Sequence, residues 1–467
     1  MRFVNREKEI EILKNTRILS KRKLFSIAIW GLRRVGKTRM MLEFMEDTDM
    51  YFFVNKNKTS MSLLDEYEFY LKNVNIINEL EKLNSWDDFF KVLFERYEGI
   101  VAFDEFQNFL SVDKSIFGSL QKYIDLNEDK KGLLLFFTGS TTGLIKKLFL
   151  DSKQPLYGRI KRQMHLKPMS FENIVDMCGE LDITELLDVI KIYAVVGGYP
   201  RYYIAVEDEN LKDVSFENII DRFFFVENAI FEDEIMSILS LEFGKRSGVY
   251  YDILTAVASG CTRISEIASF LRKKETDLTR QTYELVHHFN ILKYEEQVIG
   301  NKKLLYIDHP LMDFWFRFFY KNISDYKRRN PGFIEKTKRS INNHIGKRFE
   351  IISREFLIDK NKIPFEYHTV GRQWGKIKDA PKGQNTYEID IIALNSDSKD
   401  ILFVECKWKE LSLRQAENIL YDLQEKSKFV DWNNDVRKEH FGLIAKSIYE
   451  KAALRRRGFM IFDLDDF

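Results

Sequence analysis

Eight consecutive residues near the start of the chain have the types and the spacing that bind the phosphates of a nucleotide. They read Gly31-Leu32-Arg33-Arg34-Val35-Gly36-Lys37-Thr38. The two glycines let successive backbone amides turn toward phosphate oxygens, the lysine places a cation on the outer phosphates, and the threonine hydroxyl can ligate Mg²⁺. The segment therefore predicts binding of ATP with Mg²⁺. The predicted nucleotide-binding residues here are Gly31, Arg33, Arg34, Val35, Gly36, Lys37, Thr38 and Arg39.

Two later segments supply the polar groups that hydrolysis of ATP needs. An apolar stretch from 99 to 103 leads into Asp104 and Glu105. We expect Asp104 to hold the Mg²⁺, directly or through water, and Glu105 to polarise the attacking water. A second apolar stretch, 133–137, leads into Thr138 and Ser140, either of which could contact the γ-phosphate or the water. The alternative for Asp104 and Glu105 is an acidic strand end that faces solvent, and the alternative for Thr138 and Ser140 is a plain turn at the end of a strand.

A second group of charged residues lies in the last third of the chain. Asp390 ends one predicted strand, and Glu405-Cys406-Lys407 lies on the next. Strand alternation puts Glu405 and Lys407 on one face, where charged groups are costly to bury without a metal or ligand. We expect Asp390 and Glu405 to bind Mg²⁺ or Mn²⁺ and Lys407 to orient the water. The alternative is a half-exposed edge strand that carries a Glu–Lys pair.

The elements that position these residues predict an α/β fold. Strand 25–30 precedes the phosphate loop, and a helix from 39 to 44 follows it, so that the amino end of the helix favours an anion. With strands 100–103 and 133–137 this is the pattern of a parallel sheet. The charged, Pro-Gly-containing stretch 325–332 predicts a linker. The expected parts are a nucleotide-binding core (1–165), a helical lid (166–244), a winged helix (245–325) and a second α/β domain (326–467).

Several motifs in this order resemble the archaeal-type P-loop ATPases, a branch of the AAA+-like signal-transducing NTPases. The segment Phe3-Val4-Asn5-Arg6-Glu7 is similar to the family's opening motif, which flanks the adenine. The resemblance implies that Arg159, in 155–159, is an arginine finger or sensor, and that Pro200, in 197–201, belongs to the lid over the base. It covers about the first 320 residues. An arginine near the γ-phosphate stabilises transition-state charge, whereas the alternative for Arg159 is a salt-bridged surface residue.

Residues 249–307 are expected to form a winged helix. Helices at 249–259, 265–271 and 277–289 precede an alternating stretch that turns at Gly300-Asn301. A cluster of basic residues lies before or on the third helix and is expected to meet DNA phosphates; internal packing is the alternative. The cluster comprises Arg272, Lys273, Lys274 and Arg280.

Residues 340–445 resemble the PD-(D/E)XK nuclease core. In that core an acid on the first helix, an Asp and an E-x-K triplet share one site. The matching residues are Asp390, Glu405 with Lys407, and Glu350 on a helix expected to begin near Asn343. The resemblance implies that Glu350 is a further metal ligand or binds the metal's water. Gln415 is a further candidate, and Trp374 and Trp408 are expected to pack the core.

Composition limits the remaining possibilities. The 73 basic and 72 acidic residues leave a net charge of +1, so a DNA partner needs a local basic face. Three distant cysteines, no apolar leader and no apolar run of membrane-spanning length predict a cytoplasmic protein outside the membrane. We expect an ATPase whose nucleotide state gates a nuclease-like domain on DNA, with a possible homo-oligomer formed through Arg159. The alternative is a signalling or assembly ATPase whose last domain binds partners without cutting.

Overall fold

The computed structural model describes residues 3–243, 248–377, 380–381 and 385–467. The chain forms two compact units. The first comprises Met1–Pro168, Tyr199–Tyr202 and His287–Asn290, and the second comprises Met169–Gly198, Tyr203–Val286 and Ile291–Phe467. The finer division into four parts stays a prediction, and its boundary at 244/245 lies outside the described residues. Among the described helices, none combines the length and the apolar character needed to cross a membrane.

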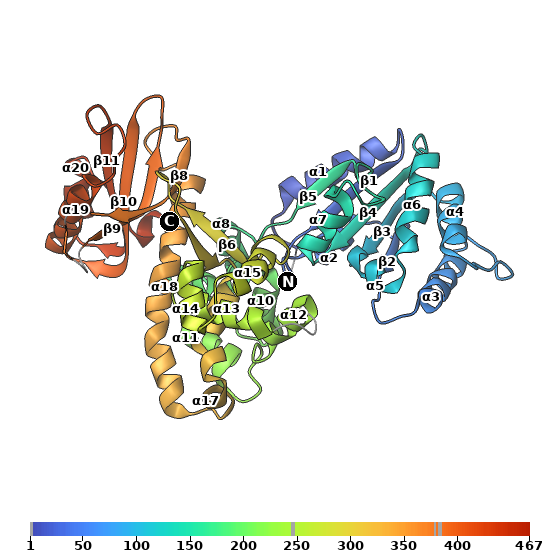
Figure 1. Cartoon of the computed structure of the whole chain (residues 1–467), viewed down its shortest axis with the longest axis horizontal. Helices are drawn as coiled ribbons and strands as arrows, with labels where there is room; N and C mark the ends of the chain where they lie inside the picture. The colour runs from blue at the N-terminus through green and yellow to red at the C-terminus, as the bar shows by residue number, and fades with distance from the viewer. Residues whose placement is uncertain (1–2, 244–247, 378–379, 382–384) are drawn as a thin grey trace. The chain divides into compact units, whose positions relative to one another are not determined.

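The first unit is built on a parallel sheet of five strands, coloured blue to cyan in Figure 1. The strand order is β2-β3-β4-β1-β5. The bounds are β1 Phe25–Trp30, β2 Met50–Phe53, β3 Gly99–Asp104, β4 Leu133–Gly139 and β5 Arg162–His165. Every residue of β1 and β4 is buried, as expected for central strands covered on both faces. The three strands predicted from sequence are therefore confirmed, each to within two residues.

Helices surround this sheet, and aromatic residues fill much of the space beneath them. Phe52, Phe89, Phe103 and Phe106 are buried in one continuous apolar cluster. The helices are α1 Glu7–Ser20, α2 Lys37–Phe44, α3 Ser60–Asn73, α4 Trp86–Arg96, α5 Phe109–Val112, α6 Ser115–Leu126 and α7 Thr142–Leu150. The large core gives the phosphate loop a rigid base, because a close-packed interior resists deformation.

The first part of the second unit is helical, as predicted. It contains α8 Phe171–Gly179, α9 Leu186–Val196, most of α10 Pro200–Asp208, α11 Phe216–Ile220 and α12 Glu234–Phe243. Three helices and a hairpin follow: α13 Gly248–Ala258, α14 Ile264–Leu271, α15 Thr276–His287, β6 Leu292–Glu296 and β7 Lys303–Ile307. This order of elements matches the expected one, and the winged-helix interpretation itself stays a prediction. Helix α16, Pro310–Phe318, comes next.

The predicted linker at 325–332 is wrong. Helix α17 spans Ile323–Lys327, and α18 runs from Pro331 to Asp359, so α18 begins well before Asn343. The side chain of Asn330 accepts hydrogen bonds from the backbone N–H groups of Gly332 and Phe333. Proline at the first helical position and an asparagine cap start a helix, so here the Pro-Gly pair opens α18 instead of breaking the chain.

The last part of the second unit is a five-stranded mixed sheet of order β12-β11-β10-β9-β8. Strands β8 to β10 are antiparallel, whereas β10, β11 and β12 are parallel. Figure 1 shows this sheet in orange and red beside α18. The bounds are β8 Thr369–Lys376, β9 Thr386–Leu394, β10 Asp400–Leu411, α19 Leu413–Ser427, β11 Lys438–Ile448, α20 Lys451–Arg456 and β12 Met460–Phe462. The turn predicted at 395–400 lies between β9 and β10.

Candidate functional site

The phosphate loop joins the carboxyl end of β1 to the amino end of α2. Gly36 has φ +97°, in the left-handed region that favours glycine. A Cβ added at Gly31 would lie 2.3 Å from the carbonyl oxygen of Leu166, so no larger residue fits there. The ammonium of Lys37 donates to the carbonyl oxygens of Gly31, at 2.8 Å, and Leu32, at 3.1 Å. The lysine is thereby held across the mouth of the loop.

Two motifs distant in sequence adjoin this loop within the first unit. The guanidinium of Arg6 donates to the carbonyl oxygens of Val35, at 3.3 Å, and Lys167, at 2.7 Å. A Cβ added at Gly36 would lie 3.9 Å from Cγ of Pro200. The expected opening motif and the lid proline therefore lie beside the phosphate loop, while their contact with a base stays a prediction.

Asp104, at the end of β3, lies beside the last residue of the phosphate loop. Its carboxylate accepts hydrogen bonds from Thr38 Oγ1, at 2.8 Å, from the Tyr51 hydroxyl, at 3.0 Å, and from Thr138. A hydroxyl and a carboxylate this close form the oxygen donor pair that Mg²⁺ prefers next to phosphates. Burial, and then the charge of Asp104, raises the pKa of Tyr51. The phenol therefore stays a donor to the carboxylate.

Glu105 follows in the left-handed conformation, with φ 55°. Its carboxylate accepts hydrogen bonds from the Ser140 hydroxyl, at 2.7 Å, and from the side-chain amide of Gln107. Ser140 thus contacts the candidate base, and Thr138 contacts Asp104. Sequence reasoning missed Tyr51 and Gln107. Tyr51 shows no motif, and only the pairing of β2 with β3 brings it to Asp104.

Arg159 lies near the amino end of β1, whereas the phosphate loop follows the carboxyl end of that strand. Its guanidinium donates to both carboxylate oxygens of Asp125, each at 2.8 Å, and to the carbonyl oxygens of Pro155 and Tyr157. Its own carbonyl oxygen accepts from Ser26, the second residue of β1. The phosphate loop follows the last residue of β1, so Arg159 is a full strand length from it. In this structure the guanidinium is therefore paired with Asp125, away from the phosphate loop of its own chain, and the role of Arg159 as an arginine finger stays a prediction.

The second acidic site lies on β9 and β10 of the other unit. Asp390 accepts from the backbone N–H of Cys406, at 2.8 Å, and lies 3.3 Å from the ammonium of Lys407. Lys407 also pairs with Glu405, at 2.5 Å. The ammonium of Lys426, a residue of α19 that sequence reasoning did not name, reaches the other oxygen of Glu405 at 2.6 Å. The fold therefore brings two carboxylates and two ammonium groups together.

The electrostatics differ among the three carboxyl groups of this site. Burial, and then the nearby Asp390, raises the pKa of Glu350 on α18 to about 7. Burial and the adjacent Glu405 also raise the pKa of Asp390. Burial acts in the same direction on Glu405, but Lys407 and Lys426 outweigh it and lower its pKa. Within the described part of the chain, no three acidic, histidine or cysteine side chains are close enough together to hold a metal ion.

Known proteins resemble this chain over its whole length. It is 30% identical over 471 residues to an uncharacterized protein of Methanocaldococcus jannaschii, and the alignment covers 100% of both chains. Residues 3–206 match a family described as an ATPase domain predominantly from Archaea. The chain belongs to the same family as this Methanocaldococcus jannaschii protein, and its residues 3–206 form the archaeal ATPase domain. Residues 315–419 of this ATPase also match a family described as archaeal and bacterial proteins of unknown function.

A solved structure supports the fold of this archaeal ATPase. The Walker-type ATPase of Pyrococcus abyssi superposes with a TM-score of 0.52 and 21% identity, covering 68% of this chain and 96% of that chain. At that identity the likeness shows the fold alone. The α/β nucleotide-binding fold is thereby confirmed, and the nuclease-like assignment of the last domain stays a prediction.

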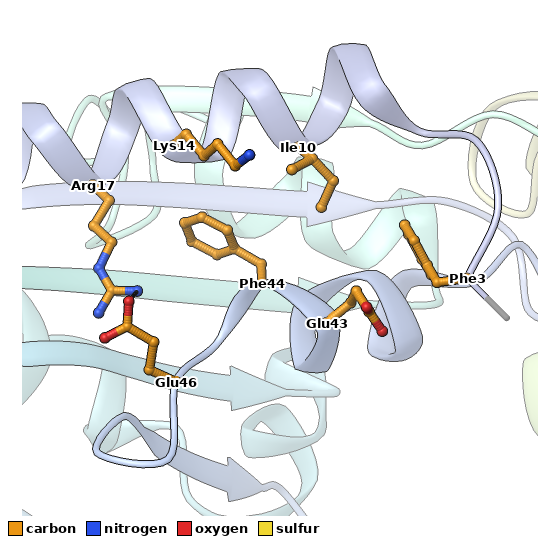
Figure 2. Close-up of a pocket in the computed structure, with 7 residues that line it drawn as sticks. All are labelled: Phe3, Ile10, Lys14, Arg17, Glu43, Phe44 and Glu46. Atoms are coloured by element: carbon orange, nitrogen blue, oxygen red, sulfur yellow. Dashed lines mark ion pairs between the residues drawn. The ribbon is translucent and has the colours of Figure 1, made fainter.

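A cavity of about 390 Å³ lies between α1 and α2 of the ATPase unit. Phe3, Ile10 and Phe44 form its apolar part, and charged side chains from both helices surround them (Figure 2). None of the phosphate-loop residues lines it. It lies toward the carboxyl end of α2, whereas phosphates bind at the amino end, so we do not assign it to the triphosphate.

Gln415 is not part of the second site. Its side chain accepts a hydrogen bond from the backbone N–H of Ser412 at the start of α19, at 2.9 Å, and so forms a capping box. A glutamine three residues after a serine cap satisfies the free N–H groups of a helix start. Trp374 and Trp408 do pack: Trp374 is buried, and the Trp408 ring lies 5.0 Å from that of Phe349.

The hairpin β6–β7 is attached to the sheet of the last domain. The N–H of Val298 donates to the carbonyl oxygen of Arg372 on β8, at 3.3 Å, and the N–H of Ile299 donates to Gln373 Oε1, at 2.9 Å. Two of the predicted DNA-contacting residues form ion pairs: Lys273, just after α14, pairs with Asp252 on α13, at 3.8 Å, and Arg280 pairs with Glu284 on its own helix, at 2.9 Å. The hairpin tip is therefore a packing surface here, and DNA contact by the basic cluster stays a prediction.

Proposed function

We propose that this protein hydrolyses ATP with Mg²⁺ held beside Thr38 and Asp104, and that its nucleotide state gates a last domain that acts on DNA. The observation that carries the first part is the 2.8 Å hydrogen bond from Thr38 Oγ1 to Asp104. It joins the phosphate loop to the end of β3. A divalent cation taken up there would bridge the phosphates and neutralise charge during transfer.

Each residue of the first site has one role in this proposal. The backbone N–H groups of the loop bind the phosphates, and Lys37 neutralises the outer ones. Glu105 accepts a proton from the attacking water, and Ser140 and Gln107 hold its carboxylate in place. Tyr51 and Thr138 hold Asp104 so that its oxygens stay directed at Thr38.

Substitutions at Lys37 and Glu105 test the hydrolysis. Lys37→Ala should abolish tight ATP binding, because the phosphates lose their cation. Glu105→Gln should bind ATP normally yet hydrolyse it about a hundredfold or more slowly, as expected for a lost general base. Nucleotide binding and phosphate release are measured on the same preparations. If Glu105→Gln hydrolyses ATP at the wild-type rate, Glu105 is not the general base.

For the last domain we propose metal-dependent phosphodiester cleavage. Asp390 and Glu405 supply carboxylate oxygens of the kind that Mg²⁺ and Mn²⁺ prefer, and Lys407 lies within 3.3 Å of Asp390 to orient water. Glu350 adds a third acid.

The cleavage test uses plasmid and linear DNA with Mg²⁺ or Mn²⁺, with and without ATP. Asp390→Ala and Lys407→Ala should abolish cutting while ATP hydrolysis continues. Dependence of the wild-type cutting rate on ATP supports the gating. The nuclease proposal fails if the wild type cuts nothing, or if all three proteins cut alike.

A signalling or assembly ATPase with a non-cutting last domain is the second candidate. Two observations favour it. Glu405 forms ion pairs with Lys407 and Lys426, and the described residues contain no group of three side chains that could hold a metal ion. The outcome that distinguishes it is ATP hydrolysis and partner binding without any cleavage of DNA.

A further inference from the structure

Lys426, on helix α19, forms an ion pair with the carboxylate of Glu405. Helix α19 packs on β10 and β11 through a buried face that includes Leu420, Leu423 and Ser427. Lys426 adjoins this face near the end of the helix and extends to Glu405. The carboxylate of Glu405 is only 4% exposed, and its two oxygens pair with different lysines, at 2.5 and 2.6 Å.

The four residues Asp390, Glu405, Lys407 and Lys426 form a cluster whose charges balance without any added ion; Glu350, whose pKa burial raises to about 7, is not counted in it. Asp390 and Glu405 carry two negative charges, and Lys407 and Lys426 carry two positive ones, all joined by the pairs described above. A divalent cation that binds Glu405 must displace an ammonium from it. Among the residues that the structure describes, the ammonium of Lys426 contacts Glu405 alone, whereas Lys407 keeps its contact with Asp390. Once the cation is bound, the cluster has an excess of two positive charges, which favours an anion such as a phosphate group.

We propose that Lys426 is a positioning residue that competes with the divalent cation for Glu405 and, once displaced, binds the phosphate of the DNA. The site then takes the cation weakly by itself and more strongly together with a phosphodiester. This inference rests on the proposed function in one respect, that the second site binds a cation and DNA. It does not require that the DNA be cut.

The test is Mn²⁺ binding to the full-length protein, measured by calorimetry. Asp104→Asn is introduced into every protein so that the nucleotide site adds no signal. In that background Lys426→Met should bind Mn²⁺ about tenfold more tightly than the parent, because a charge-assisted hydrogen bond no longer holds Glu405 in the cation-free state. Lys428→Met is the matched control, since Lys428 is 65% exposed and pairs with Glu425 instead.

A second measurement separates this role from a merely structural one. With Ca²⁺ present, Lys426→Met should bind a short DNA duplex several-fold more weakly than Lys428→Met, because a phosphate contact is lost. Damage to the fold would weaken both Mn²⁺ and DNA binding, whereas the proposal requires opposite signs. Thermal unfolding midpoints identify any variant that is misfolded.

The outcomes distinguish the two proposals. Mn²⁺ affinity of Lys426→Met no higher than that of the control overturns the competition, and so does Mn²⁺ binding that survives Asp390→Asn. Unchanged DNA affinity overturns the phosphate contact. If the affinities move as expected while the wild type cuts no DNA, the role of Lys426 stands and the nuclease proposal fails.

Discussion

Arg159 gives the most informative perturbation of the ATPase unit. Ser26, which bonds to the Arg159 carbonyl oxygen, and Gly31 are five residues apart along β1 and its exit, about 16 Å at the rise of a strand. An arginine side chain held by Asp125 does not cover that distance. In the conformation of this structure, Arg159 could therefore stabilise transition-state charge only at the nucleotide of a second copy.

The expected effects on rate and on stability differ widely. An arginine finger contributes about 10³-fold or more to hydrolysis, so Arg159→Ala should lose most activity if the role is real. The stability change should be small, because Arg159 is 26% and Asp125 45% exposed and such pairs contribute only about 0.2–1 kcal/mol. Asp125→Ala, the control, breaks the same pair but keeps the guanidinium, and it should retain hydrolysis.

The assay is phosphate release as a function of protein concentration, followed by mixing. Arg159→Ala keeps a competent nucleotide site, whereas Lys37→Ala keeps the arginine. Mixing two inactive proteins should restore part of the activity, and the wild-type rate per chain should rise with concentration. The reasoning is refuted if Arg159→Ala hydrolyses ATP at the wild-type rate. A large loss without rescue, at a rate independent of concentration, would require a conformation in which Arg159 reaches its own nucleotide.

Two further predictions concern the second unit. Burial, aided by Arg348, lowers the pKa of His309 to about 3, so acidification protonates the unfolded chain first and destabilises the fold as pH falls below about 6.5. His309→Asn keeps a cap for α16. Between roughly pH 7.5 and 5.5, the variant should lose about 1.4 kcal/mol less unfolding free energy than the wild type, measured by urea unfolding. An equal loss in both proteins would contradict a buried neutral histidine. Charge reversal at Lys273 and Lys274 should weaken DNA binding and flatten its dependence on salt, and an affinity equal to that of the wild type would move the contact elsewhere.

The nucleotide-binding half of the site could be predicted from the order of the residues alone. Gly31, Gly36, Lys37 and Thr38 are local in the chain, and their spacing acts through a single strand–loop–helix turn. The strand that ends in Asp104 is apolar throughout, so its position in a buried parallel sheet could also be predicted. In the last domain, alternation along β10 correctly put Glu405 and Lys407 together, because a strand has a period of two.

The distant side chains that reach these groups could not be predicted, because they depend on how strands and helices pack. Tyr51 comes to Asp104 through the pairing of β2 with β3, and Lys426 comes to Glu405 because α19 packs over β10. Neither residue lies in a motif. Arg159 shows the reverse case. Its motif could be recognised in the sequence, but the residue lies at the amino end of β1, opposite the phosphate loop. Spacing along a chain specifies local geometry, whereas the edge of a sheet on which a loop emerges depends on how all the strands assemble.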